Sequence, residues 1–530
     1  MSVARGVHEV ILAASLDEGG VPPTMSVRTP SRELRLPSFI DSGGNICVRV
    51  RADEIGDYVL SLAATGQVAT EFSVTEGMTS AAPRLDRAGR QLVTSTGEPF
   101  LWLADTWWFA LCDRVTSEEL AGLLSQRREQ GYNVVQLVAG LFPEVDAFED
   151  LGDLGGGWPW TPDFTGLDPH WWELADQRLT QIVDAGMVPA IVGAWSYYML
   201  DMGPDRIARH WREVIARWAA FPVVWCVAGE AGLPHYDQVG TAEQDELVSA
   251  LAGQWRDTAR MVKELDGYDN LRTVHPCPAF SHYSSTDVFG DVADLDLIWL
   301  QTGHADRAAI DSSLDAMDRE LSHQHGLPVI NSEVCYEGIA AGSPATLQRF
   351  LFWSNVLSGA AGHTYGAQGL WAFRRAQDPG PGLMWGDATW QQAAELPGAE
   401  QLGFAADLLR SRAWADLVPS PEALSVHATV DRRLLPYAAR RHDEVIAYFP
   451  AASMMPLGIG ISQELMDVRF QMLAVGTWQV RYWNPRAGTF VGGYETEVDD
   501  DGQLRMRDGT RRSALPSLED WVVVATRQAR

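Results

Sequence analysis

Two glutamates, Glu230 and Glu333, have the sequence surroundings that point most directly to chemistry. Glu230 ends the apolar run VVWCVAGE, and Glu333 lies near the end of PVINSEV. An ionisable side chain at the end of an apolar strand is costly unless it is paired or takes part in a reaction. Glycoside hydrolysis needs two carboxyl groups: one protonates the leaving oxygen, and the other attacks the anomeric carbon or activates water. We therefore predict Glu230 and Glu333 as a catalytic pair.

The elements that must position this pair alternate between apolar strands and amphipathic helices from residue 96 to residue 412. We predict strands at 100–105, 134–140, 188–195, 223–230, 272–278, 297–303, 328–334 and 361–366. Eight such βα units indicate an α/β fold, the (β/α)8 TIM barrel, in which reactive groups lie at the C-terminal ends of the strands. Strands four and seven face each other across a barrel, at a carboxyl separation of roughly 5–5.5 Å, which is the geometry of retaining enzymes.

The segments on either side of the barrel show the alternation of short antiparallel strands. Residues 1–77 predict an N-terminal β-sandwich, in which 38–50 and 56–60 form a hairpin, and residues 78–95 predict a linker. Residues 413–530 predict a C-terminal β-sandwich.

Polar and aromatic residues follow the ends of the eight predicted strands, and we expect them to bind a sugar. Flat aromatic side chains pack against the apolar faces of sugar rings, and polar side chains bind hydroxyls. The 21 tryptophans of the chain favour such a site. The expected aromatic contacts are Trp107, Trp108, Trp195, Tyr197, Tyr336, Tyr365 and Trp371. The expected polar contacts are Asp105, Gln136, His275, His282, Gln301 and His304, with Glu337 as a contact at the rim.

Two patterns could suggest a metal or a cofactor, and we interpret both otherwise. His275, His282 and His304 lack a tight ligand spacing such as HxH or HExxH, so we expect them to bind hydroxyls and predict no metal. The run GGGWPW at 155–160 lacks the Lys-Ser/Thr of a phosphate-binding loop, so we expect a loop over the site. No cofactor is required.

The bulk composition limits the partners. With 41 Lys and Arg against 70 Asp and Glu, the net charge is 41 − 70 = −29, which repels nucleic acid and anionic membrane. The sequence has no secretory pattern, no membrane-spanning run, and five scattered cysteines without a CxxC motif. We therefore expect a cytoplasmic protein with reduced thiols, whose partner is a small carbohydrate. The composition leaves self-association into a homo-oligomer open.

Four stretches of the chain carry a resemblance to a known family. FLWLADTWWFAL, followed by a helix and GYNVVQLV, resembles the opening of the apiosidase-like glycoside hydrolases. The late stretch MWGDATWQQAAELPGAEQLGFAADLLRSRAWADLVPS is also similar to that family. SFIDSGGNICVRVRADEIGDYVLSL resembles the N-terminal sandwich often fused to these barrels, and VRYWNPRAGTF resembles their C-terminal sandwich, which is sometimes labelled collagen-binding. A cytoplasmic protein would not meet collagen, so we expect that sandwich to support the barrel.

The resemblance implies a retaining mechanism, with Glu230 as the acid/base and Glu333 as the nucleophile. It implies an exo-glycosidase that releases a furanose such as apiose or arabinose from a small glycoside. Two departures matter. Gly229 stands where the wider group of retaining barrels has Asn, so the usual contact to the sugar 2-hydroxyl must come from elsewhere. Glu230 stands where apiosidase-like relatives can have Asp, so its side chain is one methylene longer than theirs.

Two other interpretations stay open at this stage. The same barrel could carry a transglycosylase or an inverting glycosidase. From another class, the chain could be a non-catalytic carbohydrate-binding protein whose sandwiches carry the function.

Overall fold

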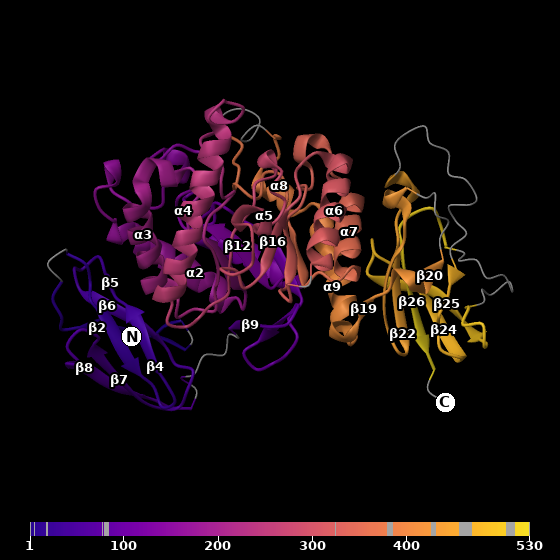
Figure 1. Cartoon of the computed structure of the whole chain (residues 1–530), viewed down its shortest axis with the longest axis horizontal. Coiled ribbons are helices and arrows are strands. Elements are labelled where there is room, and N and C mark those ends of the chain that lie inside the picture. Colours follow the sequence, from indigo (N-terminus) through magenta and orange to yellow (C-terminus); the bar gives the residue numbers. More distant parts are fainter. Residues whose placement is uncertain are drawn as a thin grey trace.

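The computed structural model describes residues 2–4, 6–16, 20–76, 78, 84–323, 325–378, 385–425, 431–454, 469–504 and 515–528. A barrel occupies the centre of the molecule, with the N-terminal sheets on one side and the C-terminal sheet on the other (Figure 1). The predicted (β/α)8 barrel between two β-rich regions is confirmed. The domain boundaries at residues 77, 95 and 412 stay predictions.

The N-terminal region packs two antiparallel sheets face to face, in the strand orders β1-β2-β6-β5 and β4-β3-β7-β8. The first sheet contains β1 (Ser2–Ala4), β2 (Val7–Leu12), β5 (Phe39–Ile40) and β6 (Ile46–Arg51). The second contains β3 (Thr24–Arg28), β4 (Glu33–Pro37), β7 (Gly56–Leu62) and β8 (Val68–Val74). The predicted hairpin between 38–50 and 56–60 is wrong, because β6 pairs with β2 and β5 whereas β7 pairs with β3 and β8 in the other sheet.

The segment predicted as a linker contains a small hairpin. Strands β9 (Leu85–Ala88) and β10 (Gln91–Thr94) pair in antiparallel register. Gly89 lies in the turn with a φ of 60°, a left-handed conformation that glycine adopts without steric cost.

Eight parallel strands form the barrel, in the order β15-β14-β13-β12-β11-β18-β17-β16. They are β11 (Trp102–Thr106), β12 (Val134–Val138), β13 (Val188–Val192), β14 (Val224–Cys226), β15 (Arg272–Thr273), β16 (Ile298–Gln301), β17 (Val329–Glu333) and β18 (Gly362–Tyr365). Between β15 and β16 the Ser285 hydroxyl donates to the Val274 carbonyl at 2.7 Å and accepts from the Trp299 amide at 2.9 Å. The Ser285 side chain thus connects β15 and β16, the two strands at the ends of the order given above.

The helices surround these strands, as Figure 1 shows for the central part of the molecule. They are α1 (Ser117–Glu129), α2 (Pro169–Asp184), α3 (Tyr198–Trp218), α4 (Gln244–Leu265), α5 (Ser285–Phe289), α6 (Ala309–Ser322), α7 (Ala345–Leu357), α8 (Trp390–Ala394) and α9 (Pro397–Arg410). With helices outside and side chains filling the inside, the strands are buried on both faces, so they are continuous apolar runs and not alternating ones. Most of the tryptophans fill this core: the twelve largest fully buried side chains are all Trp.

The C-terminal region is built on a six-stranded antiparallel sheet in the order β19-β21-β22-β26-β24-β25. Its strands are β19 (Val418–Pro419), β21 (Tyr437–Arg441), β22 (Glu444–Phe449), β24 (Gly476–Asn484), β25 (Thr489–Val498) and β26 (Trp521–Arg527). A two-stranded sheet of β20 (Leu424–Ser425) and β23 (Arg469–Phe470) supplies Leu424 and Phe470 to the same apolar core.

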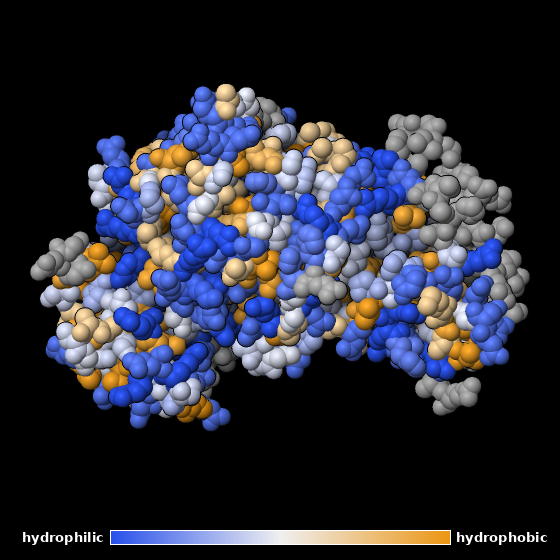
Figure 2. All heavy atoms as spheres, in the orientation of Figure 1, coloured by the Kyte–Doolittle hydropathy of each residue, from blue (hydrophilic) through white to orange (hydrophobic). Residues whose placement is uncertain are grey.

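The surface agrees with the acidic composition. On the face shown in Figure 2, hydrophilic side chains cover much of the barrel helices, and hydrophobic residues lie scattered between them. No helix among the described residues combines the length and the apolar character needed to cross a membrane. All five cysteines are buried and none forms a disulfide.

A buried carboxylate joins the N-terminal sandwich to the barrel. Arg49 of β6 donates to both carboxylate oxygens of Asp176 in α2, at 2.9 and 2.6 Å. Arg217 of α3 donates to the same carboxylate at 2.8 Å, and the Trp218 indole donates to it at 2.6 Å. Both guanidinium groups are buried, and Asp176 is the carboxylate that they share, while Glu9 also pairs with Arg49 at 3.0 Å and Glu213 with Arg217 at 2.6 Å.

The C-terminal sheet is joined to the barrel by the same arrangement. Arg349 of α7 donates to both oxygens of Asp520, at 2.6 and 2.9 Å. Arg486, in the turn between β24 and β25, donates to that carboxylate at 2.7 Å. Each flanking region is therefore held by one buried Asp between two arginines.

We predict that Asp176→Asn destabilises the protein by about 1.5–3 kcal/mol, because Arg49, Arg217 and the Trp218 indole lose the charged acceptor that they share. Urea unfolding followed by tryptophan fluorescence measures the loss. The matched control is Asp257→Asn, which removes an exposed pair with Arg260 and should change stability by less than about 1 kcal/mol. Equal effects of the two substitutions would contradict this account of the domain contact.

Candidate active site

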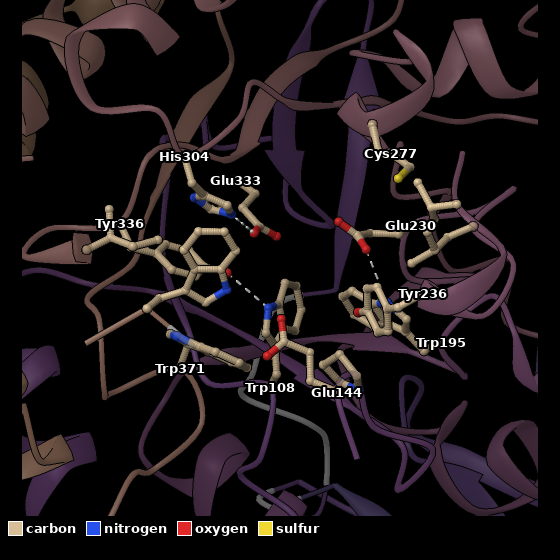
Figure 3. A pocket seen from close by; sticks show the side chains of 16 residues that line it. Trp108, Glu144, Trp195, Glu230, Tyr236, Cys277, His304, Glu333, Tyr336 and Trp371 are labelled. Carbon is tan, nitrogen blue, oxygen red and sulfur yellow. Dashed lines mark hydrogen bonds and ion pairs between the residues drawn. The ribbon is translucent and has the colours of Figure 1, made fainter. Parts of the chain in front are cut away.

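A cavity of about 300 Å³ opens at the C-terminal end of the barrel, and the segment after every barrel strand contributes to its wall. Figure 3 shows the side chains that line it. They are Trp108, Pro143, Glu144, Trp195, Glu230, Leu233, Tyr236, Val239, Cys277, Ala279, His304, Glu333, Tyr336, Ile339, Trp371 and Trp385. The predicted pair Glu230 and Glu333 lies in the wall, and Figure 3 shows the two carboxyl groups directed toward the same space.

Glu230 is held in a backbone conformation that side chains other than glycine rarely adopt. Strand β14 ends at Cys226, earlier than predicted, and Glu230 follows with a φ of 43°. Such strain, of order 1–3 kcal/mol, persists where the surroundings fix the chain, and it is concentrated at functional sites. The Glu230 carboxyl accepts hydrogen bonds from Gln301 Nε2 at 2.9 Å and from Trp195 Nε1 at 3.3 Å.

Gly229 is explained by the packing of Trp195. A Cβ atom at position 229 would lie 2.1 Å from Cε3 of the Trp195 ring, far inside van der Waals contact. An asparagine before the strand-four glutamate is thus incompatible with the indole that binds Glu230. In this chain the ring of Trp195 occupies the space that such an asparagine side chain would need.

Glu333 lies at the end of β17, between two imidazoles. His304 Nε2 is 2.9 Å from Oε1, and His275 Nε2 is 3.1 Å from Oε2. Burial raises the pKa of Glu333, but the contacts with His275 and His304 outweigh it and hold the pKa at about 2. Burial lowers the pKa of His304, whereas Cys335 and Glu333 raise it to about 10, so His304 is an imidazolium beside a carboxylate.

Glu230 has the opposite electrostatic environment. Burial raises its pKa and the negative charge of Glu333 raises it further, while the hydrogen bond from Gln301 acts in the other direction. One carboxyl of the pair is therefore stabilised as the anion, and the other is favoured in its protonated form. Two titratable groups whose pKa values are pushed apart in this way are suited to separate acid and base roles.

Aromatic side chains form one wall of the cavity. Trp108 Nε1 donates to the Tyr336 hydroxyl at 3.0 Å, and the Trp108 ring packs edge-on against Trp195 with centroids 5.7 Å apart. Tyr336 lies 6.2 Å from Trp371 and 4.6 Å from the His304 ring. Of the predicted sugar contacts, these five side chains line the cavity.

His275 and Gln301 are placed differently from the prediction. Neither lines the cavity, and both are buried. Each instead contacts one of the two glutamates, His275 at Glu333 and Gln301 at Glu230. Their expected direct contact with hydroxyls is wrong, because both side chains contact the predicted pair and neither lies in the cavity wall.

Four more predicted contacts are buried within the protein and do not line the cavity. Asp105 forms an ion pair with Arg127 at 2.7 Å with both side chains fully buried, and Trp107 is fully buried. Gln136 donates to the Ser332 carbonyl at 2.8 Å. Tyr365 donates to Glu337 at 2.6 Å. A residue at a strand end can point into the barrel, as Gln136 does toward Ser332, or outward to the helices, as Asp105 does toward Arg127 of α1. The sequence alone does not distinguish these directions from the cavity.

The last three predicted contacts also lie away from the cavity. Tyr197 donates to the Phe142 carbonyl at 2.9 Å and supports a neighbouring loop. His282 lines a separate groove beside α4 and α5. Glu337, expected at the rim, is buried and accepts from the Gly398 amide at 2.9 Å.

Several residues of the wall were missed: three lie in loops well beyond the strand ends, and Cys277 lies within the segment predicted as the fifth strand. Glu144 follows β12, Tyr236 follows β14, Cys277 follows β15 and Trp385 follows β18. Nothing in a single sequence fixes how such loops fold back. A charged residue in the apolar context LFPEV was the one signal that could have identified Glu144.

His275 and His304, two of the histidines predicted not to bind metal, both contact the Glu333 carboxylate. Within the described residues, the side chains close enough together to hold a metal ion are Glu320, His323 and His325, at the C-terminal end of α6. That group precedes β17 and so lies toward the opposite end of the barrel from the cavity.

Comparison with known proteins identifies relatives of the barrel. The family model for the apiosidase-like catalytic domain matches residues 86–416. No curated protein sequence gives a match to this chain.

Three solved structures share the fold. One, described as a glycoside hydrolase, superposes with a TM-score of 0.67 at 19% identity, over 85% of this chain and 97% of its own. A glycoside hydrolase family 5 protein from Bacteroides vulgatus ATCC 8482 gives 0.66 at 18% identity, over 85% of this chain and 93% of its own. A protein of the same strain, assigned provisionally as a glycoside hydrolase, gives 0.66 at 16% identity over 99% of both chains. The order of sandwich, barrel and sandwich therefore recurs in that protein.

We predict that Gly229→Ala destabilises the protein by about 1–3 kcal/mol, because the added methyl group overlaps the Trp195 ring. The displaced indole should also lose its hydrogen bond to Glu230, which changes the tryptophan emission. Urea unfolding followed by fluorescence measures both effects. Gly253→Ala in α4 is the matched control: nothing lies within 4 Å of its added methyl group, so it should leave stability unchanged or raise it by up to about 1 kcal/mol. A neutral Gly229→Ala would refute the packing explanation.

Proposed function

Because the chain belongs to the apiosidase-like family of glycoside hydrolases, we propose that it is a retaining exo-glycosidase with Glu333 as nucleophile and Glu230 as acid/base. The observation that carries this proposal is the difference between the two carboxyl environments. Two imidazoles stabilise Glu333 as an anion, whereas burial and the charge of Glu333 favour the protonated form of Glu230. A nucleophile must be ionised and a general acid must carry its proton, which is the division that these surroundings favour.

In the first step, Glu230 transfers its proton to the glycosidic oxygen as the bond to the anomeric carbon breaks. The Glu333 carboxylate attacks that carbon from the other side and forms a glycosyl ester, while the aglycone leaves as an alcohol. The ester oxygen carries no negative charge, so the pKa of Glu230 falls at this stage. Glu230, now a carboxylate, takes a proton from water, the water attacks the anomeric carbon, and Glu333 is released as the anion.

The neighbouring side chains support these roles through the two glutamates. Gln301 Nε2 and Trp195 Nε1 both donate to the Glu230 carboxyl, and these bonds orient it toward the cavity. His304 lies 2.9 Å from Glu333 and stabilises the carboxylate that is released in the second step. His275 and Gln301 are positioning residues in this mechanism, because they act through the glutamates.

The cavity supports exo action on a small substrate. Its volume of about 300 Å³ suits one sugar with part of a leaving group. Tyr236 and Ile339 complete its wall together with the other aromatic residues. The cavity is therefore a pocket at the end of the barrel. We propose a small carbohydrate as the substrate, with a furanose such as apiose or arabinose as the sugar released; the family membership supports this choice.

We predict that a 2-fluoro glycoside with a good leaving group labels Glu333 covalently, because the fluorine slows both steps and the leaving group restores the first. Peptide mass spectrometry locates the label. Glu333→Gln should not be labelled, and Glu230→Gln should lower kcat about 10²–10⁴-fold, as expected on loss of a general acid.

Glu264→Gln, an exposed substitution in α4, serves as the control and should keep full activity. Hydrolysis without any label on the wild-type protein would favour an inverting mechanism. Transfer of the sugar to an added alcohol in preference to water would identify a transglycosylase. Sugar binding with no turnover would indicate a non-catalytic binding protein.

A further inference from the structure

A third carboxyl group, that of Glu144, enters the same cavity from the loop after β12. Figure 3 shows it directed into the space that Glu230 and Glu333 face. The mechanism above gives Glu144 no role. Its placement nevertheless has the marks of a functional side chain: it is partly buried, it lies in the wall of the cavity, and its backbone is strained.

The loop that carries Glu144 is fixed on both sides of this residue. The Tyr197 hydroxyl donates to the Phe142 carbonyl at 2.9 Å, and the Tyr198 hydroxyl donates to the Val145 carbonyl at 3.4 Å. The Phe142 ring stacks on Phe109 with centroids 4.6 Å apart. Glu144 itself has a φ of 57°, in the left-handed region. These contacts hold the loop in a conformation that strains the Glu144 backbone, and the strain costs stability. The same conformation directs the Glu144 side chain into the cavity.

The surroundings of Glu144 offer it few partners within the protein. Burial and the charge of Glu230 raise the pKa of Glu144 to about 7, while a hydrogen bond with Trp385 acts the other way. None of the described residues that line the cavity is Lys or Arg. His304, the basic group in the wall, contacts Glu333. Hydrogen-bond donors for the Glu144 carboxyl must therefore come largely from the ligand.

A sugar supplies donors of this kind. A carboxylate has two oxygens that can accept from two hydroxyl groups on adjacent carbons of one ring. Above a pH of about 7 the Glu144 carboxyl is ionised and lies in the same wall as the Glu333 carboxylate, so a ligand that carries its own carboxylate would meet like charge in a low-dielectric space. The cavity is thus complementary to a neutral sugar with neighbouring hydroxyls.

We propose that Glu144 is a specificity-determining residue that accepts hydrogen bonds from two adjacent hydroxyls of the sugar released, and that it excludes sugars bearing a carboxylate. This inference rests on the proposed glycosidase function and adds the class of sugar. A purely structural role, in which Glu144 only holds Trp385, is the alternative. Glutamine separates the two roles, because its amide oxygen can still accept from the Trp385 indole but its charge is gone.

The experiment compares the wild type, Glu144→Gln, Glu144→Ala and the control Glu149→Gln, an exposed substitution on the same loop. The probe is whichever glycoside the wild type cleaves fastest from a panel of neutral nitrophenyl furanosides and pyranosides. The single-deoxy analogues of that probe and a nitrophenyl uronide complete the set. The readout is kcat/KM for each pair of variant and substrate, with circular dichroism to confirm folding.

In the wild type, removal of either of two adjacent hydroxyls should lower kcat/KM about 10- to 100-fold, the range expected for a hydrogen bond to a charged group. In Glu144→Ala the same removals should cost less than about threefold, because the partner is already gone. Glu144→Gln should lose most of the discrimination between the neutral glycoside and the uronide, and Glu149→Gln should behave as the wild type.

If removal of a hydroxyl lowered kcat/KM as much in Glu144→Ala as in the wild type, the Glu144 proposal would be overturned. The glycosidase function would still stand. A Glu144→Gln variant that discriminates as well as the wild type would have the same consequence, since the residue would then serve only to hold Trp385. Failure of the wild type to cleave any glycoside of the panel would instead overturn the proposed function, and the Glu144 proposal with it.

Discussion

The contact of the Glu333 carboxylate with two imidazoles is the interaction on which the rest of the site depends. A carboxylate at the end of an apolar strand would be protonated by burial alone. His275 and His304 reverse that tendency and hold the pKa of Glu333 at about 2. The charge fixed in this way is a main reason that the pKa of Glu230 is raised. The different environments of the two carboxyl groups thus come from one arrangement of four side chains, which four barrel strands or their following loops supply.

Holding these groups in place requires strain and tight packing elsewhere. Glu230 has a left-handed backbone conformation. Gly229 leaves room for the ring of Trp195, whose indole donates to the Glu230 carboxyl. The barrel around them is filled with buried tryptophans, and its two β-rich neighbours are joined to it through Asp176 and Asp520, each between two arginines. A rigid scaffold of this kind is what a preorganised site needs.

The sequence was sufficient to predict the barrel and to bring Glu230 and Glu333 into one site, because both depend on local patterns. Apolar strands alternate regularly with amphipathic helices, and Glu230 and Glu333 stand out against apolar runs. The direction of a side chain at a strand end depends on the packed barrel, so Asp105 and Gln136 were predicted as contacts although they are interior. Glu144 and Trp385 were missed because long loops fold back over the barrel in ways that only the three-dimensional structure fixes. The excess of tryptophan indicated a cleft, yet most of these residues fill the core.

The most direct test of the account is the titration of the two carboxyl groups in the free protein, followed by ¹³C NMR with labelled glutamate and assigned through Glu230→Gln and Glu333→Gln. The account predicts that Glu333 stays ionised down to a pH near 2, while Glu230 keeps its proton well above the ordinary range of a glutamate. It also predicts that Glu333→Gln lowers the pKa of Glu230, because the neighbouring negative charge is removed. Two carboxyls that titrate together near the ordinary value would contradict the assignment of nucleophile and acid/base.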